Sequence, residues 1–262
     1  MLGQVGSAWR ALVASCAELL RAGLKGGEPL KVKDFVGNAE RLAWAKANGC
    51  KWERMTCALA ARGGHLEALQ WARERDCPWN LTTCACAAEE GHLEVLRRAR
   101  EHGCPWNRLT CARAARGGHL ELLQWARAHD CPWTELTCAY AAAGGHLEVL
   151  QWLFAEDCPR DEWTCAHAAE GGHLEVLKLV RENDCPWNEW TTAHAARGGH
   201  LDVLKWARAH DCPWDWLTLK NARHHGHMAV VQWAQEYGCP DIAPWEEESE
   251  EELEDEEDVS LS

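Results

Sequence analysis

Two short blocks of small and apolar residues alternate along this chain with polar turns, and the pair of blocks recurs many times. The first block is rich in small side chains, as in Thr-Cys-Ala-Tyr-Ala-Ala at 137–142, and a glycine pair ends it. The second block starts at Gly-His-Leu-Glu and places Leu147, Val149 and Leu150 ahead of Trp152. Such spacing is typical of one face of a helix. The pattern predicts paired helices and almost no strand over 37–237, with these four side chains forming the buried face of the second helix.

A strict repeat underlies the alternation. Gly-His pairs follow one another in steps of 27 residues without an insertion, and a degenerate copy starts at Gly37. The pairs begin at Gly64, Gly91, Gly118, Gly145, Gly172, Gly199 and Gly226. Cys-Pro opens most units, and because proline fixes its own φ and disfavours helix before it, we expect a turn there. An identical period in every unit predicts that all units stack with one geometry.

The ends of the predicted helices carry residues that suit helix termini. A side chain with an acceptor oxygen precedes each first helix, where it can accept the free amides of the first turn. These residues are Asn80, Asn107, Thr134, Asp161, Asn188 and Asp215. Glycine after the first helix adopts a left-handed conformation without a Cβ penalty. Each unit is therefore predicted to be helix–turn–helix.

The segment Ala-Ala-x-Gly-Gly-His-Leu-Glu-Val-Leu resembles the helix–loop–helix core of the ankyrin repeat, from about Gly37 to Cys239. The ankyrin unit has 33 residues, so six are missing, at the place where that family forms a projecting hairpin. The resemblance implies an all-α fold: a helical solenoid of about seven to eight stacked helix–turn–helix repeats without hairpin fingers. We expect an N-terminal capping helix region at 1–34, the array at 35–243 and a disordered acidic tail at 244–262.

Charge and cysteine content narrow the function classes. The formal charge is −14, and residues 246–258 supply eleven acidic side chains and no basic one, so the remainder carries about −3 (−14 plus 11). No basic stripe suits nucleic acid, and no apolar run approaches the ~20 residues of a membrane span. Fifteen cysteines, an odd number, in a long chain without a secretory pattern indicate reduced thiols, in the cytoplasm or nucleus.

Three residue ladders invite chemical interpretations. Repeated cysteines such as Cys104 and Cys111 lie too far apart in sequence for the usual zinc spacing and behave as small buried hydrophobes. The Gly-His histidines are expected to bond backbone, and no nucleophile recurs beside them. Regularly placed tryptophans indicate packing. We therefore expect no catalytic residue, metal ligand or cofactor, although a metal- or redox-responsive protein that uses the Cys and His ladders remains the alternative.

A variable stripe on the first helices is the candidate binding site. Repeats conserve packing residues, so a partner is read by the positions that differ among units, on the expected concave face. In the C-terminal half this stripe mixes aromatic with charged side chains, a mixture enriched at interfaces. The predicted partner-binding residues are Tyr140, Trp163, His167, Glu170, Trp190, His194 and Arg197. We expect a monomeric protein–protein interaction scaffold without catalysis, bound to neither nucleic acid nor membrane.

Overall fold

The computed structural model describes residues 36–47 and 55–241. The chain divides into two compact units, and the boundary lies between Pro132 and Trp133. Within these ranges fifteen elements form, all α-helices, and no strand occurs. The first unit contains α2 (Ala39–Ala47), α3 (Thr56–Arg62), α4 (Leu66–Arg73), α5 (Leu81–Glu89), α6 (Leu93–Glu101), α7 (Arg108–Arg116) and α8 (Leu120–Ala128). The second contains α9 (Glu135–Ala143), α10 (Leu147–Ala155), α11 (Glu162–Glu170), α12 (Leu174–Glu182), α13 (Glu189–Gly198), α14 (Leu201–Ala209), α15 (Trp216–His224) and α16 (Met228–Glu236). The all-α repeat prediction is confirmed, while the predicted capping region and acidic tail lie outside the described residues.

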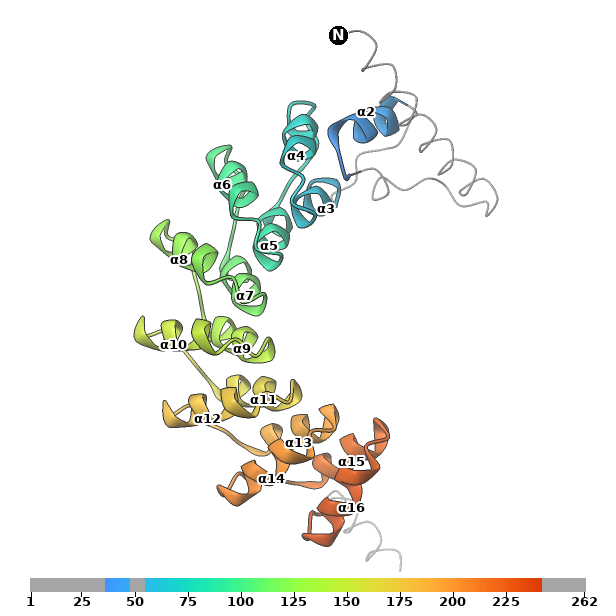
Figure 1. Ribbon diagram of the computed structural model, residues 1–262, viewed down its shortest axis with the longest axis vertical. Helices are drawn as coiled ribbons and strands as arrows, with labels where there is room; N and C mark the ends of the chain where they lie inside the picture. Colours follow the sequence, from blue (N-terminus) through green and yellow to red (C-terminus); the bar gives the residue numbers. More distant parts are fainter. Residues whose placement is uncertain (1–35, 48–54, 242–262) are drawn as a thin grey trace, which may run out of the picture. The chain divides into compact units, whose positions relative to one another are not determined.

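Within each unit, the first helices of successive repeats pack directly against one another. Helix α5 packs between α3 and α7 in the first unit, and α11 packs between α9 and α13 in the second (Figure 1). Their contact faces carry small side chains, such as the buried Cys165, Ala166 and Ala169 of α11. Small side chains allow the helix axes to approach closely. Each second helix packs on the first helix of its own repeat, as α12 does on α11.

The second helices bury a narrower face than the sequence predicts. In α10 the buried side chains are Val149, Leu150 and Leu153, whereas Leu147 is 38% exposed and Trp152 is half-buried. The prediction that Leu147 is buried is therefore wrong. At 100° per residue, Leu147 lies about 110° around the helix from the centre of the buried face, and Trp152 lies about as far on the other side. Both residues consequently border the core instead of filling it.

Local signals set the helix ends. Asn107 Oδ1 accepts a hydrogen bond from the Leu109 amide at 3.0 Å, and Asp215 Oδ1 accepts one from Leu217 at 3.0 Å, as predicted, whereas the predicted cap Asp161 makes no such side-chain bond. The second glycine of each pair is left-handed, with φ of 72° at Gly172. The second helices end just before the Cys-Pro turn, where an aspartate such as Asp157, with φ of 51°, takes the left-handed conformation. Aspartate tolerates this region better than most residues.

Cysteine thiols form hydrogen bonds between successive repeats within each unit. The thiol of the turn cysteine donates to the carbonyl of the helix-capping residue 24 positions earlier, as in Cys104 to Asn80 at 3.5 Å and Cys185 to Asp161 at 3.2 Å. All described cysteines are buried and unpaired by disulfides. Burial raises the pKa of Cys212 to about 12, so this thiol stays protonated at neutral pH. These contacts support the packing interpretation of the cysteine ladder.

Tryptophans form a half-buried outer layer. The turn residue Trp187 meets Trp206 of α14 edge to face, with ring centroids 6.0 Å apart, and the Arg181 guanidinium lies 4.2 Å from the Trp187 ring centroid. The same Arg–Trp contact recurs at Arg100 and Trp106, at 4.2 Å. Stacked arginine and edge-to-face indoles stabilise such sites modestly beyond the area they bury. The tryptophans of the turns and second helices therefore pack against their neighbours, as predicted, but they do so near the surface of the repeats.

Among the described helices, none combines the length and apolarity that a bilayer crossing demands.

Candidate functional site

The seven residues predicted to bind a partner lie together on the first helices of the second unit. Helices α11 and α13 each carry an exposed tryptophan as their second residue and further side chains of the patch four and seven positions later. Residues at these spacings share one helix face. Tyr140 of α9 adjoins them through His167, with ring centroids 6.5 Å apart. We call this surface the α11–α13 patch, which comprises Tyr140, Trp163, His167, Glu170, Trp190, His194 and Arg197.

Glu170, the last residue of α11, is the polar centre of the patch. Its Oε2 atom lies 2.9 Å from His194 Nδ1 and 3.7 Å from His167 Nδ1. Its other oxygen, Oε1, lies 3.4 Å from Arg197 Nη1. His167 comes from the same helix one turn earlier, whereas His194 and Arg197 come from α13. One carboxylate therefore joins two adjacent repeats through three basic side chains.

Two opposing effects act on the pKa of Glu170. Partial burial raises this pKa, but the hydrogen bond with His194 and the electrostatic interactions with His194, Arg197 and His167 together lower it by more. The net result is a pKa below the ordinary glutamate range. Glu170 is therefore an ionised carboxylate at neutral pH, available as a hydrogen-bond acceptor or as a ligand.

A pair of stacked indoles adjoins this polar centre. Trp163 and Trp190 stack on each other with ring centroids 5.9 Å apart and planes inclined by 30°. The edge of the His194 ring meets Trp163 at 5.8 Å. Even so, Trp163 is 39% exposed and Trp190 is 37% exposed, while His194 is nearly buried. The tryptophans thus contact each other and also present apolar surface to solvent.

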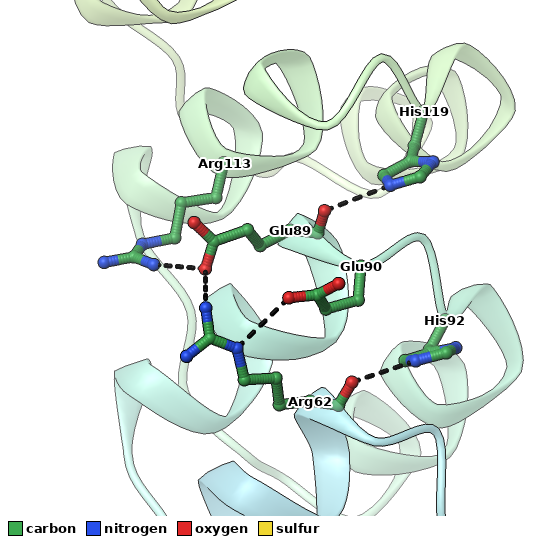
Figure 2. A network of polar contacts seen from close by, with 6 residues as sticks. All are labelled: Arg62, Glu89, Glu90, His92, Arg113 and His119. Atoms are coloured by element: carbon green, nitrogen blue, oxygen red, sulfur yellow. Dashed lines mark hydrogen bonds and ion pairs between the residues drawn. The ribbon is translucent and has the colours of Figure 1, made fainter. Parts of the chain in front are cut away.

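The first unit carries an equivalent polar network without the aromatic residues (Figure 2). Glu89 holds the repeat position of Glu170, and its Oε2 lies 2.5 Å from Arg113 Nη1. Arg113 follows Glu89 by 24 residues, as His194 follows Glu170. Arg62 of α3 adds a second guanidinium at 3.4 Å from Glu89 and contacts Glu90 at 3.1 Å. The same helix–helix offset therefore produces a permanent Arg–Glu pair in one unit and a His–Glu pair in the other.

The Gly-His histidines have the structural role that the sequence predicts. His119 Nε2 lies 3.0 Å from the Glu89 carbonyl oxygen, and His92 Nε2 lies 3.0 Å from that of Arg62 (Figure 2). His173 makes the same bond to Ala143 at 3.2 Å in the second unit. In each case the accepting carbonyl lies 30 residues earlier, at the C-terminal end of the first helix of the preceding repeat. These bonds satisfy carbonyls that a helix C-terminus leaves free.

One feature of the patch escaped the sequence analysis, which assigns no metal ligands. His167, Glu170 and His194 each offer a ligand atom, and these three atoms lie within 4.8 Å of one another. The spacing that produces this convergence becomes visible in the structure. Residues of neighbouring repeats that are 24 positions apart face each other, as the Glu89–Arg113 pair also shows. This spacing is the period of 27 minus three, which is close to one helical turn of 3.6 residues.

Comparison with known proteins identifies the repeats. A family model described as ankyrin repeats (many copies) matches residues 84–127, which extend from α5 into α8. The crystal structure of the human ASB11 ankyrin repeat domain is similar over 60% of this chain and 83% of that chain, with a TM-score of 0.46 and 15% sequence identity. No curated protein sequence matches this chain. Residues 84–127, which include one copy of the Gly-Gly-His-Leu-Glu motif, therefore match ankyrin repeats, as the motif predicts.

Proposed function

We propose that this ankyrin-repeat array is a non-catalytic protein-binding scaffold that holds its partner on the α11–α13 patch. Ankyrin repeats are generally protein–protein interaction modules. The observation that supports this patch is the exposed stack of Trp163 and Trp190, because large aromatic side chains dominate the binding energy of many interfaces. The patch lies on the first helices, whose variable face the sequence predicts to be concave.

The surroundings of the indole stack suit an interface. Charged residues at a rim exclude water and orient a partner, while a central aromatic pair provides most of the affinity. Here Arg197 and Glu170 flank the two indoles, and Arg197 keeps about half of its side chain exposed. We expect a partner that places an apolar side chain on the indoles and an acidic group near Arg197.

The first unit offers a weaker version of this surface. Its residues at the repeat position of the two tryptophans are Thr82 and Leu109. Its charged residues Arg62, Glu89 and Arg113 already pair with one another. Glu170 and Arg197 are paired in the same way in the second unit, so the two surfaces differ in the aromatic anchor, which the first unit lacks. The second unit is therefore the expected centre of binding.

Substitution of the indoles tests this proposal. Tagged full-length chain is used to capture partners from host cells, with quantitative mass spectrometry of wild type, Trp163→Ala and Trp190→Ala. The matched control is Leu109→Ala, which truncates a side chain at the same repeat position that is 37% exposed. We expect each tryptophan variant to weaken binding of the same protein by at least ~10-fold, and the control to leave it nearly unchanged.

Melting temperatures of the same proteins separate binding from folding. A tryptophan variant that keeps its melting temperature and loses the partner supports the patch. A variant that stays folded and retains the partner fully refutes it. Loss of the partner in parallel with a large fall in melting temperature refutes it too, since Trp163 and Trp190 would then serve packing.

A further inference from the structure

We propose that His167, Glu170 and His194 form a binding site for one divalent transition-metal ion of the zinc class. The three side chains supply two imidazole nitrogens and one carboxylate oxygen from two adjacent helices of the second unit. Their ligand atoms, Nδ1 of each histidine and Oε2 of Glu170, already converge. The three ligands belong to the α11–α13 patch, but the site follows from their geometry and does not require a bound partner.

The distances suit an ion after small adjustments. Zinc bonds to nitrogen and oxygen are ~2.0–2.2 Å long, so tetrahedral ligands are separated by about 3.4 Å. Glu170 Oε2 is 2.9 Å from His194 Nδ1 and 3.7 Å from His167 Nδ1, one slightly shorter and one slightly longer than that value. All three atoms lie within 4.8 Å of one another. The two imidazole nitrogens, which lie within 4.8 Å of each other, must approach by at most ~1.4 Å, so modest side-chain rotations complete a three-ligand site.

The ligand types select the kind of ion. Imidazole nitrogen suits zinc, copper, nickel and iron, whereas magnesium and calcium prefer sites made of oxygen alone. Two histidines and one carboxylate form a known catalytic zinc ligand set that leaves a further coordination position open. The partly exposed Trp163 and Trp190 adjoin the ligand His194, and this ligand set leaves a fourth position open. Water or a donor group of a bound protein can occupy it.

Neighbouring side chains hold the ligands in place. Arg197 contacts Oε1 of Glu170 and so leaves Oε2 directed toward the two histidines. The rings of Trp163 and Tyr140 contact His194 and His167 edge to face, at 5.8 and 6.5 Å between centroids. The ring contacts restrict the orientation of the two imidazoles, and polar outer partners such as Arg197 commonly change metal affinity by ~10–100-fold. The ligands therefore need little reorganisation.

The first unit shows that the arrangement is specific to α11 and α13. Arg113 occupies the position of His194, and a guanidinium is not a metal ligand. The ladder histidines differ too, since His119 and His173 place a ring nitrogen on a backbone carbonyl oxygen. The proposed site is thus separate from the repeated Cys and Gly-His ladders.

Calorimetric titration of the reduced full chain with zinc chloride tests the site, and cobalt chloride provides an absorbance signal of coordination by nitrogen and oxygen. Two variants use residues that the chain itself places at these repeat positions: His194→Arg, as at Arg113, and His167→Tyr, as at Tyr140. Both are therefore expected to fold. The control is His210→Ala, which removes an exposed histidine at the C-terminal end of α14, outside the α11–α13 patch.

We expect one zinc ion per chain in wild type and His210→Ala, and at least ~10-fold weaker binding in each ligand variant. We also expect no comparable binding of magnesium. Absence of zinc binding in folded wild type overturns the proposal. Equal zinc affinity in wild type and both ligand variants overturns it as well, because the ion would then occupy other histidines or thiols. Circular dichroism establishes that each titrated variant is folded.

Discussion

Replacement of Leu150 by alanine should destabilise the array far more than the same replacement at Leu147 in the same helix. Leu150 is fully buried in α10, whereas Leu147 is 38% exposed. The two residues share a residue type, a helix and a repeat, so the comparison isolates which face of the helix is buried.

The magnitude follows from the atoms removed. Leu→Ala deletes three carbon atoms, and at about 0.8 kcal/mol per buried carbon group the lost burial amounts to about 2.4 kcal/mol. A residual cavity adds about 1 kcal/mol where the surroundings relax only partly. We therefore expect Leu150→Ala to lower the free energy of unfolding by about 3–4 kcal/mol. At Leu147 solvent already reaches the side chain, and the expected cost is below ~1.5 kcal/mol.

Urea denaturation followed by circular dichroism measures both variants against wild type. Neighbouring repeats stabilise one another, so a central substitution is expected to shift the transition of the whole array. Equal losses in the two variants, or a larger loss for Leu147→Ala, would show that the buried face of the second helix is assigned incorrectly. A loss below ~1 kcal/mol for Leu150→Ala would do the same.

Two further predictions concern the turns. Burial raises the pKa of Asp215. The hydrogen bond from the Leu217 amide lowers this pKa and the negative charge of Glu189 raises it, and the net result is a raised pKa, so folding disfavours the ionised form. This penalty develops as the pH rises through the pKa of the folded state. Asp215→Asn should therefore stabilise the protein by less than ~1 kcal/mol at pH 7, seen as a slightly higher melting temperature, and should have no such effect near pH 3. A larger gain at pH 3 than at pH 7 would contradict this sign. At Gly172, with φ of 72°, an added Cβ would lie 2.5 Å from His200 Nδ1, whereas at Gly238, with φ of 78°, it would meet no atom within 4 Å. Gly238→Ala should lower the free energy of unfolding by ~1–2 kcal/mol, because only the backbone conformation is disfavoured there. Gly172→Ala should lower it by more, and equal melting temperatures of the two variants would disprove the clash.

Much of the candidate site was predictable from the repeat alone. The variable stripe follows from residues such as Trp163, His167 and Glu170, spaced four and three positions apart on a helix whose other positions are small. The structure brings all seven predicted residues onto one surface. Their convergence on the Glu170 carboxylate was not predicted, because comparison of equivalent positions 27 residues apart does not reveal which non-equivalent positions meet.

The sequence by itself determined the helices, the turns and the period, since caps, glycines and Cys-Pro turns act over a few residues and recur in every unit. Only the tertiary structure decided how one first helix meets the next. Their offset of about one turn places His194 beside Glu170 and Arg113 beside Glu89. It also decided that Leu147 borders the core, because the direction from which a neighbouring helix approaches is a property of packing and not of local sequence.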